Sequence, residues 1–330
     1  MVLGELDDLG ESIPRPGKSH SVLPPILIAS AAPRATVCAM QRSLSVLAAA
    51  VVAVFSPATS TAADRTPAYI SDSEVQARFV KEMSKLLEDE KTTDPAELAK
   101  QLQAEATCEL DLPTTRGGTG LTPVKVYQQA ADSVLCFGNI YKCGKCSKWH
   151  ANLAGGVILT ADGISVTNYH VMDNDKAGAF GAITRDGRVF PVSEVLASSK
   201  AADAAIVRLE ASGLTPAALS INDPVGTPVC AITHPTGRFY TLTTGVISRY
   251  YMKRAPRTSK TKRVCITADF AKGSSGSGIF NDSGNLVAIV TSTSSIYYNK
   301  EEGDAKNLQM VIKDCVPAES ILALVKKADR

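Results

Sequence analysis

The sequence predicts an all-β protein, a barrel or a sandwich, preceded by a short helical segment. From about Val124 onward, short runs rich in β-branched residues alternate with turn signals, and no long helical pattern separates them. Three of these signals, at 161–163, 185–187 and 282–284, end in Asp-Gly or Ser-Gly, as hairpin turns often do. The chain has 330 residues, of which 45% are hydrophobic, so it can bury a sizeable core.

The N-terminal part has the layout of an export signal. Residues 40–43 form a short basic start, an apolar run covers 44–55, and small residues continue to 63. We therefore expect 1–39 to be a disordered or untranslated leader, with translation starting at Met40, and 40–63 to be a secretory signal peptide. The apolar run is shorter than the ~18 residues of a membrane span. We expect a secreted or periplasmic protein with no stable membrane insertion after signal removal, and an N-terminal membrane anchor is the alternative.

Two amphipathic helices are predicted next, within a helical extension and linker over residues 64–123. Ser71 to Glu74 is a capping box followed by apolar residues at helical spacing. Asp94-Pro95, with Glu97 behind it, is a second helix start. Residues 113–122, with three glycines, are typical of a linker. The simplest role of these helices is to pack on the following domain. A propeptide and an oligomerisation arm are the alternative roles.

Residues 124–330 are predicted to form one β-rich domain with a terminal helix over 317–327. Ile279-Phe280 is expected to continue as a strand. The other expected strands are 134–141, 155–159, 164–167, 179–184, 189–195, 205–209, 229–233, 242–251, 264–268, 286–292 and 308–312.

One glycine-rich turn, residues 271–280, predicts the chemistry. Glycines on either side would leave Ser275 exposed, with backbone N–H groups directed at whatever it attacks. Serine needs a base and a group that orients this base, and His170 and Asp203 supply them. Sequence separations of 33 and 72 residues mean that only a folded domain could join the three side chains (203 − 170 and 275 − 203).

The order His, Asp, Ser and the three surrounding segments, together with 232–237 and 243–248, resemble the trypsin-like serine peptidases. The closest branch is the HtrA-like one. The resemblance implies a chymotrypsin-like double six-stranded antiparallel β-barrel over residues 124–330, with the site between the barrels. We expect no PDZ domain after the terminal helix.

The resemblance implies a serine endopeptidase that cleaves polypeptides through an acyl-enzyme intermediate and needs no cofactor. Ser275 would be the nucleophile, His170 the general base, and Asp203 the group that orients the imidazole. The amides of Gly273 and Ser275 would form the oxyanion hole. A catalytically inactive protein-binding module of the same fold is the alternative. An α/β-hydrolase fits poorly, since that fold places its histidine last.

Two positions bear on regulation and specificity. Ser274 stands where zymogen-activated proteases carry an acid, so activation by a new N-terminus is not expected. Asp269 lies six residues before Ser275, the offset of trypsin's pocket carboxylate (275 − 269). If the loop aligns without gaps, Asp269 would favour Lys or Arg in the substrate. Otherwise Asp269 ends a strand and bonds the local backbone.

A second constellation consists of Cys143, Cys146 and His150, with Cys136 upstream. These residues could hold a structural zinc ion, but a second cysteine pair is missing. In an exported protein, disulfide bonds or structural thiols are the simpler use. Cys230 and Cys265 are further candidates, either as a pair or as buried thiols.

The charge pattern gives little support for nucleic-acid binding. The formal net charge is +2, and the basic residues of segment 249–263 lack the interleaved aromatics of a nucleic-acid platform. We expect a solvated hairpin loop there, with a patch for an acidic partner as the alternative. No oligomeric state is predicted.

Overall fold

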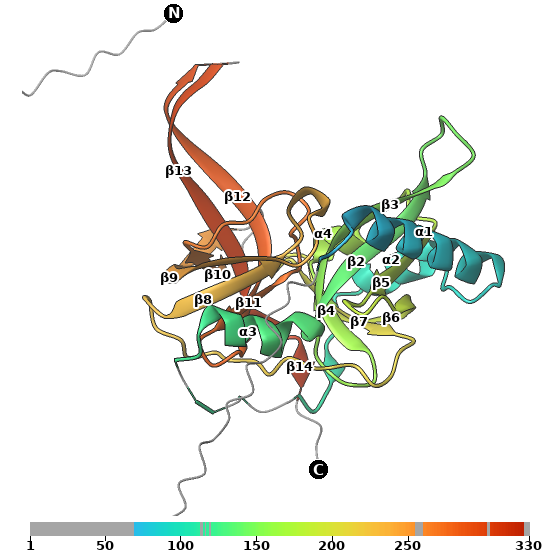
Figure 1. The fold of residues 1–330 in the computed structure, drawn as a ribbon, viewed down its shortest axis with the longest axis horizontal. Helices are drawn as coiled ribbons and strands as arrows, with labels where there is room; N and C mark the ends of the chain where they lie inside the picture. Colours follow the sequence, from blue (N-terminus) through green and yellow to red (C-terminus); the bar gives the residue numbers. More distant parts are fainter. Residues whose placement is uncertain are drawn as a thin grey trace, which may run out of the picture. The chain divides into compact units, whose positions relative to one another are not determined.

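The computed structural model describes residues 69–326, except 113–114, 116, 119, 255–259 and 302–303. The predicted leader and signal peptide, 1–63, lie outside the described residues. The β-rich part forms two closed barrels of six strands each, so the predicted fold class is confirmed (Figure 1). None of the helices in the described part of the chain has the length and apolar character needed to cross a membrane.

The first barrel has the strand order β2-β3-β4-β7-β6-β5, and neighbouring strands are antiparallel. Strand β2 is buried over its first seven residues with no alternation, because its two faces meet the barrel core and the surrounding elements. Its strands are β2 (Val134–Lys142), β3 (Trp149–Ile158), β4 (Ile164–Thr167), β5 (Ala179–Ile183), β6 (Val189–Ser199) and β7 (Ala204–Leu209).

The second barrel has the order β10-β13-β12-β11-β8-β9. Strands β12 and β13 pair over a much longer stretch than predicted and form the extended hairpin drawn in orange and red in Figure 1. Its strands are β8 (Pro228–Thr233), β9 (Thr241–Arg254), β10 (Lys260–Ile266), β11 (Gly278–Asn281), β12 (Leu286–Glu301) and β13 (Asp304–Pro317).

The two predicted N-terminal helices are present and pack on the first barrel. Helix α1 (Asp72–Glu88) begins at the predicted cap, where Ser71 accepts a bond from the Glu74 amide. Its buried Met83 lies over Gly181, where an added Cβ would come within 2.5 Å of the methionine sulfur. Helix α2 (Pro95–Gln103) buries two leucines against the same barrel. Full burial of such side chains stabilises by about 1.5–3 kcal/mol each, which favours packing over a detachable arm.

Three elements differ from the sequence prediction. Helix α3 (Pro123–Ala130) occupies the predicted start of the β-rich part. The terminal helix α5 (Ala318–Leu322) is shorter than predicted. The chain becomes extended again as β14 (Val325–Lys326), which pairs in parallel with β1 (Cys108–Glu109).

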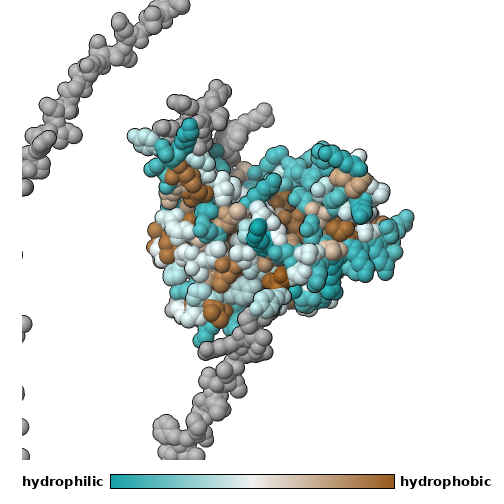
Figure 2. Space-filling model, turned by 45° about the horizontal axis from the view of Figure 1, so that its top comes forward, coloured by the Kyte–Doolittle hydropathy of each residue, from teal (hydrophilic) through white to brown (hydrophobic). Residues whose placement is uncertain are grey.

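The surface of the described part of the chain carries both hydrophobic and hydrophilic side chains. In the space-filling view, hydrophobic residues lie in several separate patches divided by hydrophilic side chains (Figure 2). Part of the exposed apolar surface belongs to the long hairpin, through Ile296, Tyr298, Leu308 and Met310.

Candidate active site

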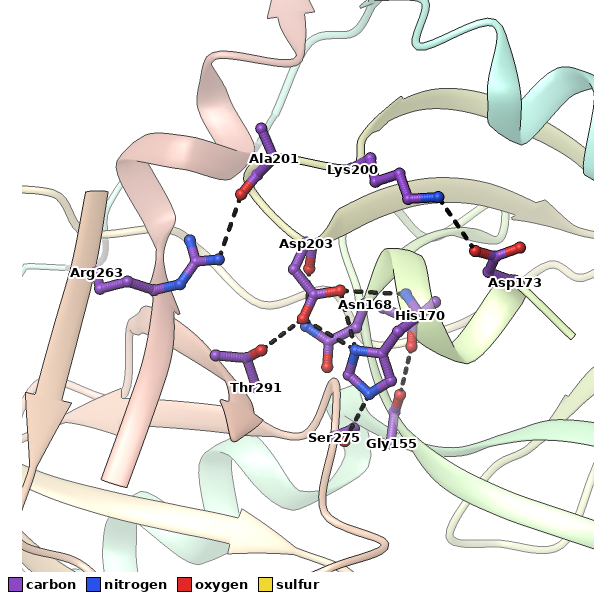
Figure 3. A network of polar contacts seen from close by, with 11 residues as sticks. Gly155, Asn168, His170, Asp173, Lys200, Ala201, Asp203, Arg263, Ser275 and Thr291 are labelled. Atoms are coloured by element: carbon purple, nitrogen blue, oxygen red, sulfur yellow. Dashed lines mark hydrogen bonds and ion pairs between the residues drawn. The ribbon is translucent and has the colours of Figure 1, made fainter. Parts of the chain in front are cut away.

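The structure brings the three predicted side chains together between the barrels (Figure 3). His170 lies on the short helix α4 (Tyr169–Met172) after β4, Asp203 on the turn between β6 and β7, and Ser275 on the loop between β10 and β11. The imidazole Nδ1 is 2.9 Å from each carboxylate oxygen of Asp203. Its Nε2 is 3.0 Å from the Ser275 hydroxyl. One imidazole therefore contacts a carboxylate and a hydroxyl at once.

The carboxylate of Asp203 is held from both barrels. It accepts a hydrogen bond from the backbone amide of His170 at 3.1 Å and another from the Thr291 hydroxyl on β12. The backbone of Asp203 is left-handed, with φ of 59°, and its carbonyl accepts a bond from the Asn168 side chain. The Asp203 side chain is 16% exposed and that of His170 is 49% exposed. The carboxylate is thus fixed, while the imidazole faces the solvent.

The loop that carries Ser275 is fastened to the first barrel by a backbone bond. The Gly155 amide on β3 donates to the Ser275 carbonyl at 2.6 Å. Gly276 is left-handed (φ of 79°), and a Cβ there would lie 2.2 Å from the Gly155 carbonyl oxygen. Glycine is therefore required at 276 both by the backbone angle and by the close approach of the two barrels.

A second glycine shapes the turn just before the serine. Gly273 has φ of 94°, and a Cβ would lie 2.9 Å from the His234 carbonyl oxygen. The carbonyl of the preceding residue, Lys272, accepts a hydrogen bond from the Thr236 amide at 2.7 Å. This carbonyl is therefore directed at the loop after β8. Among the backbone hydrogen bonds of the described residues, none has the Gly273 or Ser275 amide as donor. Both amides can therefore serve a bound group.

The side chains of His170 and Ser275 border a cleft of about 660 Å³. Both barrels and helix α1 contribute to its walls, and Gln76 of α1 is a wall residue that the sequence did not indicate. From β2 and β3 the walls include Asn139 and 151–154, and from the second barrel 236–237, Phe239 and 272–273.

A smaller cavity of about 90 Å³ also borders Ser275. Its walls are 270–272 and 290–293, with no carboxylate among them. Asp269 is not at its floor: its side chain is 83% exposed and forms an ion pair with Lys313 at 3.1 Å. The nearly buried ammonium of Lys313 also donates to the Phe270 carbonyl. The expectation of a buried carboxylate at 269 is therefore wrong, because the side chain turns outward to β13.

His234 is a buried residue that the sequence analysis did not single out. Its Nε2 is 3.0 Å from the Leu135 carbonyl oxygen of β2, and its Nδ1 accepts from the Tyr240 amide at 3.0 Å. Because the ring is fully buried, desolvation lowers the pKa of His234 to about 4. The neutral ring links the first barrel to the loop after β8. The sequence pointed to His234 only through its place in segment 232–237, one of the segments that resemble the trypsin-like peptidases.

The seven cysteines of the described residues are free thiols, so the predicted disulfide bonds are not observed. Cys143, Cys146 and His150 do come together at the tip of the β2–β3 hairpin. Cys136 does not join them, since it is fully buried near the start of β2. The suggestion that it is a fourth zinc ligand is therefore wrong.

The described residues of the basic segment 249–263 belong to the end of β9 and the start of β10, which pair as the expected hairpin, but not all of them are solvated. Arg263 is 5% exposed and directs its guanidinium at the Ala201 carbonyl, 3.4 Å away, close to Asp203 (Figure 3). Arg263 therefore joins the two barrels rather than facing a partner.

Comparisons with known proteins agree with the fold. Residues 154–289 match the model of the trypsin-like peptidase domain. The putative serine protease HhoA of Synechocystis sp. is 32% identical over 162 residues, which cover 47% of this chain and 40% of that protein. Serine endoprotease DegS of Escherichia coli is 30% identical over 173 residues, 50% of this chain and 47% of DegS.

The matched region thus spans less than half the length of these curated relatives. Among solved structures, the HtrA-type protease AlgW with decapeptide has a TM-score of 0.50 at 20% identity, with 61% of this chain and 66% of that chain covered. At this identity the likeness concerns the fold alone. The family match, the curated relatives and the double barrel lead to one conclusion: this chain carries a trypsin-like peptidase domain, and over that domain it is similar to the HtrA-like proteases.

Proposed function

We propose that the chain is a serine endopeptidase that hydrolyses polypeptides through His170, Asp203 and Ser275. The observation that carries the proposal is the single imidazole within 3.0 Å of both a carboxylate and a serine hydroxyl. The relatives' names, serine endoprotease and serine protease, support the same activity.

The mechanism follows from the positions of the atoms. His170 Nε2 takes the proton of the Ser275 hydroxyl while the oxygen attacks the scissile carbonyl carbon. Asp203, which accepts from Nδ1, keeps the other nitrogen free to take that proton and stabilises the imidazolium. The imidazolium then protonates the leaving amine, which departs and leaves an acyl-enzyme ester on Ser275. Water, deprotonated by the same imidazole, attacks the ester and regenerates the hydroxyl.

The negative oxygen of each tetrahedral intermediate would sit against the amides of Gly273 and Ser275. Both are available, and the left-handed backbone at Gly273 turns the loop tightly enough for such an arrangement. Loss of one such donor typically lowers kcat by about 10²–10³-fold.

For specificity we propose a small uncharged side chain before the cleaved bond. The cavity of about 90 Å³ beside Ser275 has room for little more than an alanine or valine side chain. None of the described residues that border this cavity carries a carboxylate, so a substrate lysine or arginine would find no counter-ion among them.

For location we propose export, with residues 40–63 as a signal peptide and 64–123 as an extension that stays with the 124–330 domain. The matched relatives include the periplasmic serine endoprotease DegP of Salmonella typhimurium. Sequencing of the mature N-terminus after expression with an export system tests this assignment.

A fluorophosphonate probe tests the proposed activity, because it labels an activated serine irreversibly. We expect labelling of the wild type and none of Ser275→Ala. Ser277→Ala is the matched control, since this hydroxyl belongs to the same loop but is fully buried. Mass-spectrometric mapping of a cleaved peptide library then gives the residue before the cut. Folded wild-type protein without labelling or cleavage would favour the inactive binding module.

A further inference from the structure

The tip of the β2–β3 hairpin gathers three side chains that the proposed peptidase chemistry does not use. Cys143 and Cys146 lie in the loop between the strands, and His150 is the second residue of β3. Their ligand atoms all lie within 4.8 Å of one another. The Cys143 and Cys146 sulfurs are 3.5 Å apart, and the Cys146 sulfur is 3.2 Å from His150 Nε2.

These distances fit a tetrahedral metal centre. With metal–sulfur bonds of about 2.3 Å, two sulfur ligands at the tetrahedral angle lie about 3.8 Å apart. The observed separation of 3.5 Å needs only a small opening to reach that value. We propose that Cys143, Cys146 and His150 bind one divalent cation of the zinc class, with a fourth position open to water.

The loop backbone supports this use of the thiols. Gly144, which lies between the two cysteines, is left-handed with φ of 73°. The chain therefore turns tightly there, and the two sulfurs come within 3.5 Å of each other.

Strand pairing fixes the third ligand. His150 lies opposite Tyr141 in the β2–β3 register, and their rings are 5.6 Å apart. The neighbouring pair, Lys142 and Trp149, closes the hairpin with the ammonium 4.2 Å from the indole ring. Trp149 packs against Gly178, where an added Cβ would come within 2.6 Å of the indole. The base of the hairpin is thus anchored, and the imidazole stays on the side of the two sulfurs.

The position of the cluster favours a metal ion over a structural thiol pair. Both cysteines are exposed and His150 is half-buried, so an ion can enter without unfolding the barrel. A disulfide would use the two sulfurs and leave the imidazole without a role. The ligand set of two thiolates and one imidazole is soft, which selects zinc-class ions over magnesium or calcium.

Cobalt(II) is the probe for the test, because thiolate coordination gives it visible absorption that zinc lacks. The full chain as Ser275→Ala, reduced with a phosphine, is titrated anaerobically with cobalt(II) and then with zinc(II). We expect one cobalt per chain, with thiolate-to-metal charge-transfer bands that disappear when zinc displaces it. Cys143→Ser, Cys146→Ser and His150→Ala should each weaken binding by more than about tenfold.

Cys108→Ser is the matched control, because this free thiol lies on β1, away from the hairpin, and its loss should leave the titration unchanged. The variants change exposed or half-buried residues, and circular dichroism checks that each is folded. Absent charge-transfer bands in reduced protein would overturn the proposal. Binding that survives in Cys146→Ser, or that is lost in Cys108→Ser, would overturn it as well.

Discussion

Lowering the pH is expected to destabilise the fold through the buried ring of His234. The ring is fully buried and neutral, and its pKa is about 4 in the folded chain against 6.5 for an ordinary histidine. Between these values the unfolded chain binds the proton and the folded chain does not. Stability from this group is therefore fully present above pH 6.5 and is lost as the pH falls toward 4.

The magnitude follows from the difference between these two pKa values, 6.5 and about 4. Each pKa unit corresponds to about 1.36 kcal/mol, so protonation of the unfolded chain alone removes about 3 kcal/mol of stability at low pH. At about pH 4.5 part of the folded chain is protonated too, so the loss relative to about pH 7.5 is roughly 2–3 kcal/mol.

Urea unfolding of the Ser275→Ala chain at a series of pH values measures this loss without self-cleavage. Other groups titrate over the same range, so the useful quantity is the difference in unfolding free energy from the double variant with His234→Asn. Asparagine can still accept from the Tyr240 amide but does not titrate. We expect the difference between the two chains to shrink by roughly 2–3 kcal/mol from about pH 7.5 to about pH 4.5. A difference that stays constant over this range would refute the assignment of a buried neutral ring.

Three further predictions concern the site. Thr291→Val removes the hydroxyl that donates to Asp203 and should lower kcat/KM by about tenfold. Thr291→Ser keeps a hydroxyl and should retain activity. Equal kcat/KM values for the two variants would contradict a role for this hydrogen bond. Gly276→Ala forces a Cβ to within 2.2 Å of the Gly155 carbonyl oxygen and should abolish fluorophosphonate labelling. Gly226 is the control, because it has a similar φ but open space around it, so Gly226→Ala should label normally. Asp269→Asn should leave the cleavage preference of a peptide library unchanged, because the carboxylate lies outside the cavity beside Ser275; a lost preference for basic residues would restore its role in specificity.

Most of the barrel could be predicted because its strands are short and bounded by glycine turns. The turns at 161–163, 185–187 and 282–284 place Gly163, Gly187 and Gly284 in the left-handed region, as an Asp-Gly or Ser-Gly signal suggests. Helix α3 was missed, although Thr122-Pro123 is a helix start, because Val124 and Val126 also fit the alternation of a strand. The length of the β12–β13 hairpin was missed because its distal part is largely exposed, so it lacks the pattern of a strand with one buried face, and cross-strand pairing holds it.

For the site, the sequence predicted which residues take part but not how every side chain is directed. The positions of His170, Asp203 and Ser275 were predictable from residue types and order, since the chemistry restricts which side chains can serve. The direction of Asp269 was not, because an offset along a loop fixes a side chain only when the loop has the same path. The partners of His234 lie on β2 and on the next loop, 99 and 6 residues away, and sequence patterns do not reveal such a tertiary bond.

The geometry of the three side chains depends on bonds that cross between the barrels. His170 and Asp203 belong to the first barrel, Ser275 and Thr291 to the second. The hydrogen bond from the Gly155 amide fixes the serine loop, and the Thr291 hydroxyl fixes the Asp203 carboxylate. The His234 ring fixes the loop after β8, whose Thr236 amide donates to the carbonyl of residue 272. Helix α1 extends this set, because the Asp72 carboxylate accepts from the Phe239 amide of that same loop at 2.9 Å. A shift of one barrel against the other would therefore disturb the serine, its base and the oxyanion amides together. For this reason we expect the N-terminal helix to be needed for full activity, even though it contributes none of the three reacting side chains.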